Sequence, residues 1–245
     1  MTSEPGFPVA DADLIAVVAV ADDQITSLDT LHELYDAPVP TSITKEIDRL
    51  SEHYRRFVEL SPFVVLATAG PEGLDCSPRG DTNGFVRVVD EHTVMIPDRR
   101  GNNRLDSLRN IVRDPRVALL LLLPGIGETL RINGRAALST NAELRESFAV
   151  RDKLPACVIV ITVERVYTQC PKALVRADLW NPDKHIPKSA VPSTGERMAA
   201  LTGGEIDAAP MTRHTRSASP TRSTDAHSAE SLAAHQPDSD AAAAR

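Results

Sequence analysis

Short apolar runs rich in β-branched residues, separated by tight polar turns, fill the middle of the chain between residues 63 and 167. The runs FVVLATA and LDCSP flank the turn GPEG, in which Pro71 presets φ and Gly73 tolerates a positive φ. FVRVV and TVMIP flank a second turn at residues 90–92. Because hairpin turns join antiparallel neighbours, whereas parallel strands need long crossovers, this order predicts an antiparallel barrel rather than a doubly wound parallel sheet.

Three later runs extend the pattern to six or seven strands. VALLLLL has the length and composition of a fully buried strand, and ACVIVITVERVY reads as a long β-branched strand. TLRINGRAALS is predicted to be a strand in which Gly134 marks a β-bulge. We therefore predict a mainly β protein of the α+β type, an antiparallel barrel with flanking helices.

Helices are predicted before and between these strands. The clearest covers residues 41–60, with an apolar stripe formed by Ile43, Ile47, Leu50, Tyr54, Phe57 and Val58. Residues 26–35 are predicted to form a short helix capped by Thr26 or Ser27. TNAELRESFAV is predicted to be a short capped helix, and KALVRADLW a helical turn.

A further helix is predicted directly after the strand TVMIP. It covers about residues 102–113 and is capped by Asn102 or Asn103. Its predicted buried face consists of Leu105, Leu108, Ile111 and Val112.

Composition divides the chain into four parts. We predict an N-terminal extension with a short helix at 1–40, the barrel domain with its leading helix at 41–186, and a C-terminal extension at 187–209. Residues 210–245 contain almost no large apolar side chains and are predicted to be a disordered tail. The apolar stretch LIAVVAVA near the N-terminus fits a strand or a short buried helix, and periodicity does not decide between them.

Charge and cysteine content exclude several classes of function. The net charge of −7 argues against a general nucleic-acid binder, which needs a basic face. Cys76, Cys157 and Cys170 form no CxxC pair, and HExxH, GxSxG and P-loop patterns are missing from the sequence, so we predict no metal site. An odd number of cysteines, an acidic N-terminus and an apolar stretch too short to span a bilayer predict a cytoplasmic protein without membrane contact.

Arginines, glycines and asparagines gather after two of the predicted strands. In SPRGDTNGF, Arg79 lies beside Gly80 and two residues after Ser77, a combination that suits a phosphate. In IPDRRGNNRLDS, three arginines surround the start of the predicted helix, where the helix dipole disfavours positive charge unless an anion binds. The sequence thus indicates an anion cradle, with ordinary polar turns as the alternative.

A second candidate group lies near residue 176. Lys172, Arg176 and Trp180 are spaced i, i+4 and i+8, so one helical face would carry two cations and an indole. The alternative is a surface turn anchored by Trp180.

Six motifs follow one another in the chain: SPFVVLAT, SPRGD, GFVRV, IPDRRGNNRLDSLRNI, PGIGETLRINGRA and KALVRADLW. Through them, residues 61–182 resemble the pyridoxamine 5'-phosphate oxidase-like flavoproteins, and most closely a bacterial subfamily with SPRGD and GNNRLDSLRNI. The resemblance implies a split β-barrel, FMN bound at the interface of a homodimer, and FMN-dependent oxidoreductase activity on an unknown small molecule. The C-terminal motif that grips pyridoxal phosphate in true oxidases is missing, so that activity is not implied.

The resemblance also assigns cofactor-binding roles. Ser77, Arg79 and Gly80 would lie where the second strand reaches the flavin phosphate. The edge of the isoalloxazine ring would meet Ile96, Pro97 and Asp98. The phosphate and ribityl site would be completed by Arg99, Asn103 and Arg104. A flavin-facing strand would supply Thr129 and Arg131, and the end of the barrel would supply Lys172, Arg176 and Trp180 from the same subunit or across the dimer.

Two alternatives stay open. The chain fits a flavin-binding module without turnover that serves as a store or sensor. It also fits the same fold with a deazaflavin or haem in place of FMN. Haem is disfavoured because His92, the histidine nearest the motifs, lies in a predicted turn.

Overall fold

The structure is a computed structural model of the 245-residue chain and describes residues 24–205. The stretch LIAVVAVA and the predicted tail at 210–245 lie outside the described residues. The chain divides into two compact units between Lys184 and His185.

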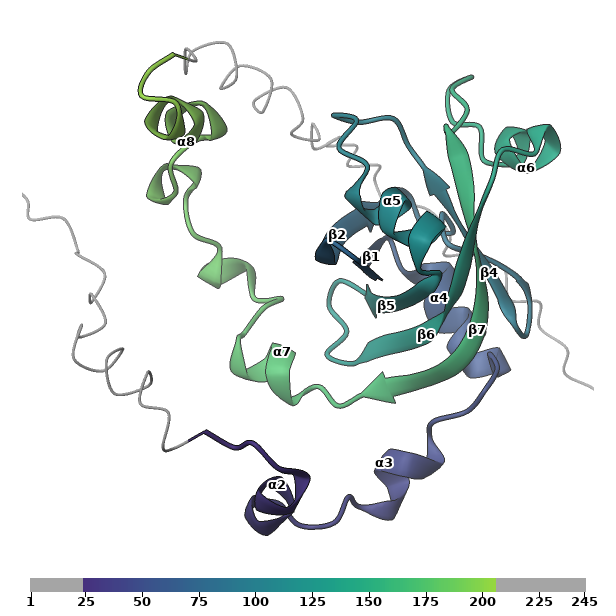
Figure 1. Cartoon of the computed structure of the whole chain (residues 1–245), viewed down its shortest axis with the longest axis vertical. Coiled ribbons are helices and arrows are strands. Elements are labelled where there is room, and N and C mark those ends of the chain that lie inside the picture. The colour runs from purple at the N-terminus through teal and green to yellow at the C-terminus, as the bar shows by residue number, and fades with distance from the viewer. Residues whose placement is uncertain (1–23, 206–245) are drawn as a thin grey trace, which may run out of the picture. The chain divides into compact units, whose positions relative to one another are not determined.

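Seven strands of the first unit form one sheet in the order β2-β1-β5-β6-β7-β4-β3 (Figure 1). They are β1 (Phe63–Gly70), β2 (Gly73–Gly80), β3 (Arg87–Asp90), β4 (Thr93–Asp98), β5 (Arg116–Leu122), β6 (Thr129–Ser139) and β7 (Cys157–Gln169). Each pairing in this sheet is antiparallel. The hairpins β1–β2 and β3–β4 and the mainly antiparallel fold are as predicted from the turns.

The sheet curls until β2 and β4 meet. These strands are five spacings apart in the sheet order, which would separate them by about 24 Å in a flat sheet. Yet Nη2 of Arg79 on β2 lies 3.8 Å from Oδ1 of Asp98 on β4. Side chains therefore join the two strands without a backbone ladder in the described sheet. We call this contact between the C-terminal ends of β2 and β4 the seam. The predicted split β-barrel with flanking helices is confirmed.

The barrel core is built from alternating strand positions. On β5, Val117, Leu119 and Leu121 are buried, and the residues between them are half-buried. The prediction that VALLLLL is buried throughout is therefore wrong, because an antiparallel strand turns every second side chain to the outer face. The core also takes fully buried side chains from the other strands, including Leu66, Ile132 and Ile161.

β6 carries a bulge at the predicted glycine. Its register against β7 shifts between Asn133 and Gly134. A Cβ atom on Gly134 would lie 2.0 Å from the carbonyl oxygen of Thr162, so β7 passes too close for any side chain. The long β7 curves strongly as it crosses the barrel (Figure 1).

The predicted helix at 41–60 is wrong as a single element. The structure has α3 (Pro40–Thr44) and α4 (Glu52–Leu60), separated by an irregular stretch. In that stretch Ile47 exchanges backbone hydrogen bonds of 3.1 and 2.8 Å with Val166 of β7, and the Leu50 amide donates to the Glu91 carbonyl at 2.7 Å. Pairing with the barrel thus replaces the helical bonds, and Ser51 caps a new helix by accepting from the Tyr54 amide.

The helix after β4 starts later than predicted and turns a different face to the sheet. α5 (Asp106–Arg113) has Leu105 as N-cap without a side-chain cap bond, so the predicted capping by Asn102 or Asn103 is wrong. Its buried residues are Ser107, Asn110 and Ile111. Leu105 and Val112, predicted to be buried, are exposed. The polar face is held inward because Nδ2 of Asn110 donates to Oγ1 of Thr68 on β1 at 3.1 Å.

The remaining helices of the first unit are short. They are α2 (Leu28–Leu34), α6 (Ala142–Ser147), α7 (Lys172–Arg176) and η2 (Pro182–Lys184). Ser27 caps α2 and Asn141 caps α6, each by accepting from a backbone amide, in agreement with the predicted capped helices.

In the second unit, η3 (Lys188–Ala190) precedes α8 (Thr194–Leu201), which opens with a capping box of Ser193 and Glu196. The described residues contain no helix with the length and apolarity required to cross a membrane.

Replacing Gly134 by alanine is expected to destabilise the barrel. The added methyl group would meet backbone rather than a movable side chain, so we expect the free energy of unfolding to fall by about 1–3 kcal/mol. Urea denaturation followed by circular dichroism measures the change. Gly101→Ala is the matched control because a Cβ at Gly101 meets no atom within 4 Å. Equal stability of the two variants would contradict the close approach at the bulge.

Candidate functional site

Two crossed ion pairs lie at the seam. Arg79 on β2 faces Asp98 on β4, with 3.8 Å between Nη2 and Oδ1. Just beyond the strand ends, Arg99 faces Asp81 in the opposite sense, with Nε and Nη2 lying 3.0 and 2.9 Å from Oδ2. Each strand end therefore contributes one cation and one anion.

A hydrogen-bonded cluster ties α5 to β2 behind the seam. Asp75, Ser77 and Arg79 alternate along β2, so their side chains project from the same face of the strand. Ser107, in the first turn of α5, donates to Oδ2 of Asp75 at 2.5 Å, and its Oγ lies 2.8 Å from that of Ser77. It also accepts a bond of 3.2 Å from Nη2 of Arg79. The cluster fixes the terminal guanidinium nitrogen of Arg79.

The Nε donor of Arg79 is a different case. It is buried, and no hydrogen-bond acceptor among the described residues reaches it. A buried donor without a partner costs about 1–3 kcal/mol. An oxygen-rich ligand at the seam would supply the missing acceptor, and this orphaned donor is the feature of the site that best fits a phosphate or ribityl group.

Asp98 is an unusually buried carboxyl group, with 8% of its surface exposed. Burial raises the pKa of Asp98, and the positive charge of Arg79 opposes this shift without cancelling it. The neighbour of Asp98 on β7 is Cys157, and burial followed by the charge of Asp98 raises the pKa of its thiol. The seam is thus a weakly solvated place in which charge is costly.

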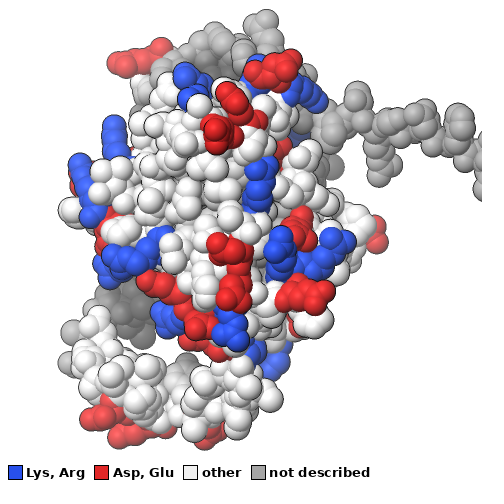
Figure 2. All heavy atoms as spheres, turned by 90° about the vertical axis from the view of Figure 1, so that its right-hand side faces the viewer, with Lys and Arg blue, Asp and Glu red and all other residues white. Residues whose placement is uncertain are grey.

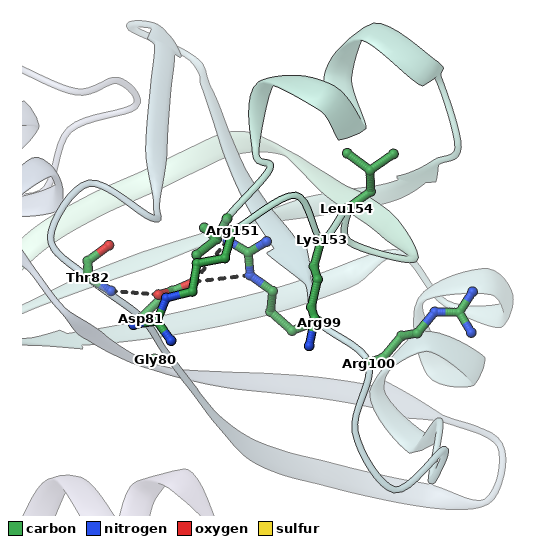
Figure 3. Close-up of a pocket in the computed structure, with 9 residues that line it drawn as sticks. Gly80, Asp81, Thr82, Arg99, Arg100, Arg151, Lys153 and Leu154 are labelled. Atoms are coloured by element: carbon green, nitrogen blue, oxygen red, sulfur yellow. Dashed lines mark hydrogen bonds and ion pairs between the residues drawn. The ribbon is translucent and has the colours of Figure 1, made fainter. Parts of the chain in front are cut away.

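Two adjoining pockets open at the seam. The smaller has a volume of about 160 Å³ and is lined by Pro78, Arg79, Gly80, Asp81, Phe85, Pro97 and Arg99. The larger, of about 770 Å³, is lined by Gly80, Asp81, Thr82, Arg99, Arg100, Val150, Arg151, Lys153 and Leu154 (Figure 3). Gly80 and the Asp81–Arg99 pair belong to both pockets and form the boundary between them.

The structure brings part of the predicted site together here. Arg79, Gly80, Pro97 and Arg99 line the smaller pocket. Asp98 contacts Arg79, and Ser77 is joined to it through Ser107.

Ser77 and Asp98 themselves line neither pocket, and the same holds for three further predicted residues, Ile96, Asn103 and Arg104. The side chain of Ile96 lies in the hydrophobic core with 0% exposed. Arg104 pairs with Asp106 and is 79% exposed, and Asn103 has a φ of 61°. The structure therefore places Ile96, Asn103 and Arg104 outside the lining of both pockets.

The second predicted group has only local contacts. Thr129 is buried at the start of β6. Nη1 of Arg131 donates to Oη of Tyr167 at 2.9 Å, and Nε1 of Trp180 donates to the Ile126 carbonyl at 2.8 Å. In the described part of the chain no recorded hydrogen bond or ion pair joins this group to the seam. Lys172 and Arg176 share the predicted helical turn α7, but the helix ends before Trp180, so the predicted face of two cations and an indole does not form.

Several residues of the site were missed by sequence reasoning. Asp81 lies in the motif SPRGD, two residues after Arg79, and Ser107 lies in RLDS, three residues after Arg104. Their closeness in sequence to these arginines was the signal that could have identified them. Arg151 and Lys153 lie in the connection between α6 and β7. Local sequence does not reveal them, because they reach the site only through the antiparallel pairing of β7 with β4.

Comparisons with known proteins agree with this architecture. Residues 50–170 match the model of a family described as pyridoxamine 5'-phosphate oxidase. No curated protein matches the chain.

Three solved structures illustrate what the chain is similar to. Group A Streptococcus HupZ is 18% identical with a TM-score of 0.41, covering 49% of this chain and 94% of that one. General Stress Protein 26 from Bacillus anthracis is 15% identical with a TM-score of 0.36, covering 47% and 93%. An F420 reductase is 18% identical with a TM-score of 0.35, covering 49% and 98%.

The raised pKa of Asp98 predicts a pH-dependent contribution to stability. An acid whose pKa is raised by folding binds its proton more tightly in the folded protein, so stability is lost as the pH rises from the ordinary value of 3.8 through the folded pKa. We therefore expect the free energy of unfolding of the native protein, minus that of Asp98→Asn, to fall over this range and then level off. Urea titrations of both proteins at a series of pH values measure the difference. A difference that rises with pH would show that attraction to Arg79 outweighs burial.

Proposed function

We propose that this protein, whose residues 50–170 form a domain of the pyridoxamine 5'-phosphate oxidase family, is an FMN-binding flavoprotein that acts as an oxidoreductase on a small molecule. The observation that carries the proposal is the buried Nε donor of Arg79, which lacks an acceptor at a seam bordered by two pockets. The residues around it suit an oxygen-rich anion such as the phosphate and ribityl chain of FMN.

The two seam arginines have different parts in binding FMN. Arg99 already uses Nε and Nη2 on Asp81, and Nη1 on the Phe148 carbonyl at 2.7 Å. It is therefore held in place and contributes a fixed positive field. Arg79 retains an unused donor, so it is the guanidinium that we assign to direct contact with the cofactor.

Further groups would complete the FMN site. Gly80 brings its backbone to both pockets without a side chain in the way. The N-terminus of α5, which has no side-chain cap, leaves amides near the Ser107 cluster for the phosphate, together with Asn103 and Arg104. Pro97 would lie along the ring edge, with Ile96 packed behind it in the core.

FMN, when bound, supplies the hydride or electron transfer of the reaction. The residues of the chain would bind and orient the cofactor and the substrate, and they would exclude water from both. Asp98 is the carboxyl group best placed to keep a proton at the seam, because burial raises its pKa. Arg79 and Arg99 would stabilise negative charge that develops on the cofactor or the substrate.

We also propose that the working form is a homodimer. Thr129, Arg131, Lys172, Arg176 and Trp180 keep their roles toward flavin or substrate in this proposal, but none of them lines a seam pocket of its own chain. A second copy would bring this group to the seam of the first. Size-exclusion chromatography with light scattering at micromolar concentration should therefore give the mass of a dimer. A monomer at this concentration would remove the second group from the site.

The same chemistry also fits a second cofactor, a deazaflavin. The seam offers hydrogen-bond donors to phosphate and polyol oxygens, which FMN and a deazaflavin share. Its described residues offer no group that would distinguish their ring systems. Haem lacks this support, because the histidines of the described chain do not line either seam pocket. A flavin store or sensor without turnover would have the same cradle, and it would differ in leaving its bound flavin unreduced by NAD(P)H and other donors.

The test is a visible absorption spectrum of the purified protein and mass identification of the compound that heating releases. The proposal expects a flavin spectrum and released FMN. A deazaflavin mass would replace FMN by the second candidate. A colourless protein that ignores added FMN would overturn the assignment.

Substitution of Arg79 tests the observation directly. Arg79→Ala removes the unused donor and its charge, so we expect FMN affinity to fall by about 1.5–3 kcal/mol. Arg79→Lys keeps the charge and loses the planar fork, and its affinity should lie between those of the alanine variant and the native protein. Fluorescence titration of FMN measures both.

Arg113→Ala is the matched control, since Arg113 pairs with Glu72 at the far end of α5 and lines neither pocket. Native affinity in Arg79→Ala, with the fold intact by circular dichroism, would exclude Arg79 from the cofactor site.

A further inference from the structure

The larger seam pocket has a charge that the FMN cradle does not explain. Its lining holds four cations and one carboxylate, and that carboxylate, Asp81, is already paired with Arg99. Arg100, Arg151 and Lys153 make no ion pair or side-chain hydrogen bond recorded within residues 24–205. In the view of Figure 3, Arg100 points away from the Asp81–Arg99 pair. The unpartnered charge beside the seam therefore comes chiefly from Arg151 and Lys153.

These two residues are set on a strained turn. Val150 and Lys153 exchange backbone hydrogen bonds of 3.1 and 3.0 Å around Arg151 and Asp152. Both central residues have positive φ, 48° and 61°, as in a two-residue turn that normally takes Asn and Gly. Arginine gains nothing from this conformation by itself, so its presence here points to a role for its side chain.

The same turn brings apolar surface to the pocket. Val150 and Leu154 line it and are 42% and 40% exposed. The volume of about 770 Å³ is in the range of small-molecule sites. A ligand that uses the whole lining therefore has an apolar body and at least one anionic group.

The charge of the pocket is local. The net charge of the protein is −7, and acidic and basic side chains are interspersed over the face drawn in Figure 2. A cluster of positive charge inside an otherwise acidic protein focuses the field on the pocket and not on a broad surface. This favours a small anion over a polyanion such as nucleic acid.

We propose that the larger seam pocket is a binding site for a small organic anion, a carboxylate or monophosphate with an apolar part, held by Arg151 and Lys153. Arg99 and Gly80 separate it from the smaller pocket, so the anion would lie next to the cofactor site. Its identification as the substrate rests on the proposed function, whereas the anion site itself rests on the pocket.

The test uses the full chain, as purified with its cofactor, and phenyl phosphate as the probe. Calorimetric titration is done on the native protein and on Arg151→Asn, Lys153→Met and Lys45→Met. Asparagine tolerates the positive φ of residue 151, and methionine keeps the length of the lysine stem without its charge. Lys45 follows α3 and lines neither pocket, so Lys45→Met is the matched control.

The proposal expects phenyl phosphate to bind more tightly than inorganic phosphate or benzyl alcohol, since the site takes both parts of the probe. Arg151→Asn and Lys153→Met should each weaken binding about tenfold or more, the scale of one charge-assisted hydrogen bond, and Lys45→Met should not. FMN affinity should be native in all three variants. Undetectable binding of phenyl phosphate, or native affinity in both pocket variants, would overturn the site.

Loss of FMN affinity in Arg151→Asn and Lys153→Met would also overturn it, because the pocket would then be part of the cofactor cradle. The proposed function fails separately. If the native protein binds no FMN and the pocket variants still lose phenyl phosphate, the anion site stands without the flavin.

Discussion

The crossed ion pairs between the ends of β2 and β4 are the contact on which the site depends. They join strands that lie five spacings apart in the sheet order, so they exist only because the sheet has curled. The net effect on Asp98 shows which force dominates. Burial raises its pKa more than Arg79 lowers it, so desolvation outweighs attraction at that pair. The Arg79–Asp98 pair is therefore a poor source of stability, whereas the barrel has a core of fully buried apolar side chains. What the seam provides instead is a set of polar strand ends without a backbone ladder, and these are free to face a ligand.

The polar inner face of α5 follows from the same arrangement. A helix that packs on a sheet usually presents an apolar stripe, but α5 turns Ser107 and Asn110 inward. Asn110 anchors the helix to Thr68 on β1, and Ser107 anchors it to Asp75, Ser77 and Arg79 on β2. The helix thus gives up some apolar burial to fix the hydroxyl group that orients Arg79. In the proposed function, a substitution at Ser107 would act on the cofactor only through Arg79, which makes Ser107 a positioning residue.

Sequence reasoning succeeded where the signal was local. The hairpins, the bulge at Gly134 and the capped helices follow from turn residues, close approach and caps that occupy a few neighbouring positions. It failed where pairing with a distant segment of the chain replaces the local hydrogen bonds that the sequence predicts. The helix at 41–60 is interrupted because Ile47 pairs with β7, and the asparagines before α5 form a turn, in which Asn102 accepts from the Arg104 amide, instead of a cap. Within the site, the motifs led to Arg79, Gly80, Pro97, Asp98 and Arg99. They could not lead to the turn at 150–154, whose place depends on the pairing of β4 with β7.

The hydrogen bonds of Arg99 keep the two pockets separate, so that each could hold a different ligand. Among the described residues, all the hydrogen bonds of its guanidinium go to Asp81 and to the Phe148 carbonyl, so these contacts hold it between the two pockets. Phe148 lies at the end of α6, two residues before the turn that carries Arg151 and Lys153. One guanidinium therefore connects the end of β2, the end of β4 and the segment just before the 150–154 turn. Free donors remain on either side of it, Arg79 in one pocket and Arg151 and Lys153 in the other. A fixed cation with an unused Arg79 donor on one side and two cations without ion pairs in the described chain on the other is suited to hold two anionic groups side by side, as the proposed phosphate-bearing cofactor and anionic substrate would require.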